Sequence, residues 1–116
     1  MPPKWIYFTD EEVVGLGFEF VAMLDRARGL AGTPFVITSG LRTLQQNQQT
    51  PNAVSDSAHL VGLAVDLACS GSQERYQIIK SLMAVGLCRL GIYSAHVHVD
   101  CDTTKPQNCN WYVAST

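Results

Sequence analysis

The chain contains three histidines, which lie in two short segments that also carry aspartates. His59 lies seven residues before Asp66. His96 and His98 lie just before Asp100. Imidazole and carboxylate are the usual ligands of catalytic zinc, which takes three protein ligands and keeps one position open for water. A single histidine is more often a hydrogen-bonded core residue, but this grouping favours a zinc site made of His59, Asp66 and one later histidine.

The two later histidines belong to a segment with the alternating pattern of a β-strand. His96, His98 and Asp100 share one face of it, because neighbouring side chains in a strand point to opposite faces. Val97 and Val99 then face the core. The pattern predicts one wall of a site, anchored from behind by valines.

Two helices are expected to support these strands. Thr9 and Glu12 form a capping-box pattern ahead of apolar residues at helical spacing, which predicts a helix that ends near Gly29. A second helix is predicted from Ser72 to Val85. Its expected apolar stripe consists of Tyr76, Ile79, Leu82 and Met83.

Short strands are predicted at residues 35–38 and 62–68, and a tightly joined strand pair at 90–93 and 95–99. The polar stretch 45–49 is expected to form an exposed loop or helix face. Helix, strand, strand, helix and hairpin in this order predict an α+β fold, with a small, largely antiparallel sheet flanked by helices.

Length and composition limit the classes of protein that remain. A chain of 116 residues with 47% hydrophobic and 16% charged residues is expected to fold as one domain over residues 1–116. A net charge of −2 gives no cationic field for nucleic acid or for an anionic membrane. No apolar run approaches the roughly 20 residues needed to span a bilayer. The first ten residues lack the features of a secretory signal, which predicts synthesis in the cytoplasm.

Four cysteines are interpreted as structural residues. They form no Cys-x-x-Cys pair, which disfavours a thiolate zinc site or a redox pair. Two disulfides are possible in an oxidising compartment, and their pairing stays open. Cys88 is expected to be a small buried apolar residue, and Cys101 and Cys109 flank a polar loop that they could close. The fourth is Cys69.

Three motifs resemble those of a known family. Residues 57–66 match the pattern Ser-x-His-x-x-Gly-x-Ala-x-Asp, residues 39–43 match Ser-Gly-x-Arg-Ser/Thr, and residues 96–98 match a late His-x-His. Together they resemble the zinc D-Ala-D-Ala carboxypeptidase family, which includes phage murein endopeptidases. The resemblance covers residues 35–100 and is nearest to the small single-domain members. It implies a single domain of the hedgehog/DD-peptidase type.

The resemblance also implies roles for individual residues. His59, Asp66 and His98 correspond to the zinc ligands. Arg42 corresponds to the residue that holds the substrate near the scissile bond. His96 corresponds to the catalytic partner of the zinc-activated water.

Two further positions bear on catalysis. Some family members carry a glutamate three residues before the last ligand, where this chain has Ala95. His96, or Asp100 acting through its contact with a ligand, must then take the role of the base. Ser57 is a second candidate for supporting a ligand from behind, although it is also a common turn residue.

The resemblance implies a zinc metallopeptidase that hydrolyses peptide bonds of bacterial peptidoglycan. The substrate is expected to be a stem peptide or a cross-link, cut by a carboxypeptidase or by an endopeptidase of the endolysin kind. We expect a monomer, encoded by a phage or a bacterium, that acts at the cell wall. The alternative is a binding module that holds zinc without turnover, and a metal-free structural protein ranks last. Arg42 and His96 favour the enzyme, because neither is needed merely to hold a metal.

Overall fold

A computed structural model describes residues 4–50 and 57–113 of the chain. In chain order, its helices and strands are α1 (Phe18–Ala31), β1 (Ile37–Ser39), α2 (Leu44–Gln49), the 3-10 helix η1 (Ala58–Val61), β2 (Ala64–Ala68), α3 (Ser72–Ala84), β3 (Arg89–Ile92), β4 (His96–Asp100) and β5 (Cys109–Tyr112). No helix in these two ranges is long and apolar enough to cross a membrane.

The strands form one five-stranded sheet in the order β1-β2-β4-β3-β5. Three neighbouring pairs are antiparallel, and only β3 and β5 run parallel. The predicted hairpin is present as β3 and β4. The structure therefore confirms an α+β fold with a small, largely antiparallel sheet.

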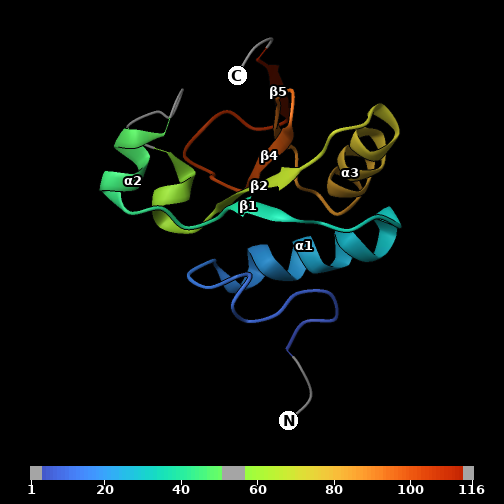
Figure 1. Cartoon of the computed structure of the whole chain (residues 1–116), viewed down its shortest axis with the longest axis horizontal. Helices are drawn as coiled ribbons and strands as arrows, with labels where there is room; N and C mark the ends of the chain where they lie inside the picture. Colours follow the sequence, from blue (N-terminus) through green and yellow to red (C-terminus); the bar gives the residue numbers. More distant parts are fainter. Residues whose placement is uncertain (1–3, 51–56, 114–116) are drawn as a thin grey trace.

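One face of the sheet packs on the hydrophobic core. Val65 of β2 and Val97 and Val99 of β4 are fully buried on this face, as the alternation of the strands requires. α1 lies beneath the sheet and packs against α3 (Figure 1). Leu24 of α1 and Leu82 of α3 are also fully buried. The opposite face carries the polar side chains of β2 and β4.

The first helix begins later than the sequence predicts. The expected bonds of the capping box are present, with the Thr9 N–H donating to Glu12 at 2.8 Å and the Glu12 N–H donating to Thr9 at 3.2 Å. They close a turn, which ends where Gly15 adopts a φ of 80°. α1 then starts at Phe18 and runs past Gly29, so the predicted bounds are wrong.

The end of α1 is set by a different glycine from the one predicted. Gly32 adopts a left-handed φ of 69° and forms the C-cap, a conformation that suits glycine because it has no Cβ. Gly29 stays helical and lies against the ring of Tyr7.

α3 has almost the predicted bounds, but its buried stripe differs. Ile78 and Leu82, four residues apart, are fully buried. Tyr76 and Met83 are 61% and 57% exposed, because residues seven apart share one side of a helix and this side points away from Ile78 and Leu82. The prediction that they belong to the core is wrong.

Burial confirms most of one further expectation and corrects another. The polar stretch 45–49 lies within α2 and is exposed as predicted, except for Asn47, which is buried at 4% exposure. Cys88 is half-buried rather than buried. All four cysteines are free thiols.

Candidate functional site

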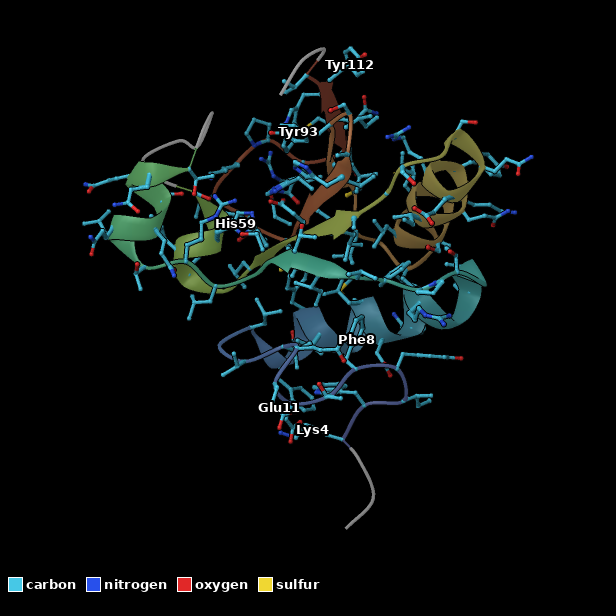
Figure 2. The ribbon with its side chains drawn as sticks, viewed as in Figure 1. Lys4, Phe8, Glu11, His59, Tyr93 and Tyr112 are labelled. Carbon is cyan, nitrogen blue, oxygen red and sulfur yellow. The ribbon has the colours of Figure 1, made fainter. Side chains whose placement is uncertain are left out.

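The predicted site residues meet on the face of the sheet opposite the core. Asp66 of β2 and His98 of β4 are direct partners in the antiparallel register. η1 precedes β2 and brings His59 beside them. Figure 2 shows His59 and Tyr93 on one side of β1 and β2, with Phe8 on the other side beside α1.

Local backbone structure positions His59. Ser57 caps η1, since its hydroxyl accepts a hydrogen bond from the His59 N–H at 3.2 Å. Gly62 ends η1 in the left-handed conformation with a φ of 74°. The Nδ1–H of His59 donates to the carbonyl of Gly40 at 2.7 Å. Nε2 is buried without a hydrogen-bond partner and lies 3.3 Å from Oδ1 of Asp66.

His98 is held in the complementary way. Its Nε2–H donates to Oδ2 of Asp100 at 2.7 Å. Nδ1 lies 3.1 Å from Oδ1 of Asp66. Each of the two histidines thus directs one ring nitrogen to Asp66. The other ring nitrogen donates a hydrogen bond to an oxygen outside the site, that of Gly40 or Asp100.

These three residues are suited to hold a metal ion. His59, Asp66 and His98 each offer a ligand atom, and these atoms all lie within 4.8 Å of one another. Two imidazoles and a carboxylate are a usual ligand set of catalytic zinc. Metal-binding histidines also characteristically donate the second ring N–H to a carbonyl or a carboxylate, as these two do.

The second oxygen of Asp66 faces two other predicted residues. Nη2 of Arg42 lies 3.3 Å from Oδ2, and Nε2 of His96 lies 3.8 Å from it. The main-chain N–H of Arg42 also donates to the carbonyl of His59 at 2.9 Å. Arg42 and His96 therefore border the candidate metal site on one side.

The guanidinium of Arg42 has a fixed orientation. Its Nε–H donates to the Ser39 hydroxyl at 3.1 Å, and its Nη1–H donates to the side-chain carbonyl of Asn47 at 3.2 Å. Asn47 extends from α2 into the site. A guanidinium held on several sides is preorganised to bind a negatively charged oxygen.

Aromatic residues hold the ring of His96. Tyr93 stacks on it with ring centroids 4.3 Å apart. The indole N–H of Trp111, on β5, points to the Tyr93 hydroxyl at 3.4 Å. Trp111 can lie there because Gly91 has no side chain: a Cβ on Gly91 would come within 2.7 Å of the indole.

Burial and neighbouring charges shift the pKa values of the ionisable groups in the site. Burial opposes ionisation of Asp66, but His59 and His98 outweigh it and hold the pKa of this carboxyl well below its usual range. Burial likewise opposes charge on His98, but hydrogen bonds with Asp100 and Asp66 raise the pKa of its imidazole. Burial lowers the pKa of His96, and the attraction of Asp66 does not compensate.

The structure places all seven predicted site residues in or behind this site. His59, Asp66 and His98 share a common centre, and Arg42 and His96 border it. The other two predicted residues, Ser57 and Asp100, support His59 and His98 from outside.

Besides Tyr93, three residues that contact this set were not predicted from the sequence. Asn47 lies in a glutamine-rich stretch that carries no signal for a buried amide. Arg89 hydrogen-bonds Asp100 but belongs to an apolar strand pattern. Trp111 belongs to none of the three motifs, and its ring centroid lies 5.5 Å from that of His98.

A solved structure of the Serratia marcescens L-Ala D-Glu endopeptidase ChiX matches with a TM-score of 0.68 and 19% sequence identity. The match covers 87% of this chain and 93% of the other, and at this identity it shows a shared fold. No curated protein matches the sequence.

The family comparison covers the whole candidate site. A family model described as Peptidase M15 matches residues 9–102, a range that spans η1, the strands β1 to β4 and all the predicted site residues. Since this range is most of the chain, the protein belongs to the Peptidase M15 family.

Proposed function

We propose that this peptidase is a zinc enzyme that hydrolyses peptide bonds of bacterial peptidoglycan. One observation carries the proposal: His59 and His98 each direct a ring nitrogen to the same oxygen of Asp66, while their outer nitrogens are bound elsewhere. Two imidazole nitrogens and a carboxylate oxygen that converge in this way can together bind a cation. Nε2 of His59 is buried without a hydrogen-bond partner, which supports its role as a ligand.

His59, Asp66 and His98 would hold the zinc ion. Bound there, zinc would lower the pKa of a coordinated water to about 7 and polarise the scissile carbonyl. Arg42, fixed by Ser39 and Asn47, would bind the carbonyl oxygen as negative charge develops on it, or the carboxylate of a substrate end.

His96 would move the proton. Its pKa is lowered by burial, so its Nε2 is available at neutral pH to take a proton from the attacking water. The stack with Tyr93 holds this nitrogen toward the site. The same nitrogen can then deliver the proton to the leaving amine.

The substrate class rests on two similarities. The motifs around His59, Arg42 and His98 resemble those of peptidoglycan peptidases, and the matched Serratia marcescens structure is named an L-Ala D-Glu endopeptidase. The bond between L-Ala and D-Glu of a stem peptide is therefore the first to test, and the terminal D-Ala-D-Ala bond is the second. Carboxypeptidase and endopeptidase activities are told apart by which of these bonds is cut.

The test combines metal content with product analysis. Purified protein is assayed for zinc and incubated with defined stem peptides, and the products are identified by mass spectrometry. We expect about one zinc per chain, cleavage that a chelator stops and added zinc restores, and neither zinc nor cleavage in His59→Ala. Zinc without cleavage of any stem peptide would indicate a binding module. Absence of zinc after reconstitution would contradict the site itself.

A further inference from the structure

Arg89 is a buried cation that the proposed mechanism does not use. It lies on β3, is 8% exposed, and faces the same side of the sheet as the site. A buried charge is costly unless it is paired and hydrogen-bonded. The groups that pair with Arg89 therefore indicate which part of the structure its charge supports.

The guanidinium of Arg89 joins Asp100 to the C-terminal part of the chain. Its Nε–H donates to Oδ1 of Asp100 at 2.7 Å. Its Nη1–H donates to the carbonyl of Pro106 and lies 3.7 Å from the Cys109 sulfur. Its carbon Cζ lies 5.1 Å from the ring of Trp111.

These contacts fix both oxygens of Asp100. Oδ1 accepts from Arg89 and from the N–H of Asp102 at 3.1 Å. Because two donors hold Oδ1, Oδ2 is left to face Nε2 of His98 at 2.7 Å. Asp100 is 2% exposed, so water cannot readily replace these partners.

The sheet register places this chain of contacts in one row. Arg89 and Asp100 are direct cross-strand partners, and Asp100 lies two residues after His98 on the same face of β4. With Asp100 accepting from Nε2, the other nitrogen of His98 must face Asp66.

We propose that Arg89 is a positioning residue for the metal site and acts through Asp100 to fix the ring and the tautomer of His98. The inference rests on the proposed zinc site. Lysine cannot replace Arg89 fully, because the compact ammonium cannot donate from an Nε position and reach the Pro106 carbonyl at the same time.

The test measures zinc affinity of folded, metal-free protein by competition with a chromophoric chelator. Loss of a partner that orients a metal ligand typically weakens affinity about 10–100-fold, and we expect this for Arg89→Met and Asp100→Asn. Arg89→Lys should lose less. If Arg89 acts through Asp100, the double variant should bind zinc no more weakly than Asp100→Asn alone.

A second arginine provides the matched control. Arg75 of α3 is also partly buried and donates to the main-chain carbonyls of Tyr93 and Ser94. Arg75→Met should keep wild-type zinc affinity, and thermal unfolding of each metal-free variant separates lost stability from lost affinity. If Arg89→Met does not fold, the comparison of Arg89→Lys with wild type decides.

Two results would overturn the inference while leaving the proposed function intact. One is wild-type zinc affinity in folded Arg89→Met or Arg89→Lys. The other is a double variant whose losses add, which would mean that Arg89 does not act through Asp100. His59→Ala should take up no zinc and serves as the reference for absent binding. If wild-type protein also takes up no zinc, the proposed function fails and this inference fails with it.

Discussion

Asp66 and His98 face each other across two paired strands, with Oδ1 of the carboxylate 3.1 Å from Nδ1 of the imidazole. His59 approaches the same oxygen of Asp66, whereas Arg42 and His96 approach the other one. The two oxygens of one carboxylate thus separate the proposed metal ligands from the proposed catalytic pair. This separation leads to predictions that can be tested one residue at a time.

Replacing His96 with alanine should leave zinc binding intact and abolish most turnover. His96 lies on the Oδ2 side of Asp66, and the outer ring nitrogens of His59 and His98 keep their hydrogen-bond partners without it. Loss of a general acid–base typically lowers the rate about 10²–10⁴-fold. Zinc content and kcat on a stem peptide check the prediction.

His59→Ala is the comparison for that experiment. It should lose zinc and thermal stability together, because metal binding and folding are coupled. If His96→Ala lost zinc as readily as His59→Ala, His96 would be a ligand and the separation at Asp66 would be wrong.

The pH profile of kcat/KM should have an acidic limb below pH 6.5, the ordinary pKa of histidine. His96 must be neutral to accept a proton, and burial lowers its pKa, so it stays neutral into more acidic solution. A zinc ion nearby would disfavour a second positive charge and shift the pKa in the same direction. Residual activity of His96→Ala should lack this limb, and a wild-type limb above pH 6.5 would contradict the assignment.

Asn47→Ala should reduce kcat/KM without loss of zinc. The Asn47 side chain accepts a hydrogen bond from Arg42, and hydrogen bonds to charged groups contribute about 1.5–3 kcal/mol. We therefore expect a loss of about tenfold or more. Gln48→Ala, an exposed position on the same helix, is the control and should retain wild-type activity. Equal activity of the two variants would show that Arg42 needs no support from α2.

Gly62→Ala should destabilise the fold more than Gly32→Ala does. Both glycines have a left-handed φ, which costs other residues about 1–2 kcal/mol. A Cβ on Gly32 would meet nothing within 4 Å, but one on Gly62 would collide with the main-chain carbonyl of Gly15. Thermal unfolding of the two metal-free variants measures the difference. Equal losses would mean that the contact with Gly15 adjusts at no cost.

The sequence alone was sufficient for features that depend on local pattern. Strand alternation put His96, His98 and Asp100 on one face and the valines on the other, because side-chain direction in a strand follows from backbone geometry. The motif around His59 and Asp66 was recognisable because its residues lie close together in the chain. The α+β fold with a largely antiparallel sheet followed from the order of the predicted elements.

Other features depended on tertiary packing. The capping pattern at Thr9 was interpreted as the start of a helix. Instead, Gly15 adopts a left-handed conformation beside Leu41 and ends the turn. The Gly17 N–H then donates a hydrogen bond to the carbonyl of Gly62 at 3.0 Å. β5 was not predicted, because its parallel pairing with β3 joins segments that no short-range pattern connects.

The supporting residues of the site were also decided by the tertiary structure. Asn47, Arg89 and Trp111 come from a helix, a central strand and the last strand, and each contacts a predicted site residue outside its own helix or strand. Chemistry-bearing residues can be recognised by type and spacing. Their outer partners need only the right atom at the right place, and that placement arises when the sheet assembles.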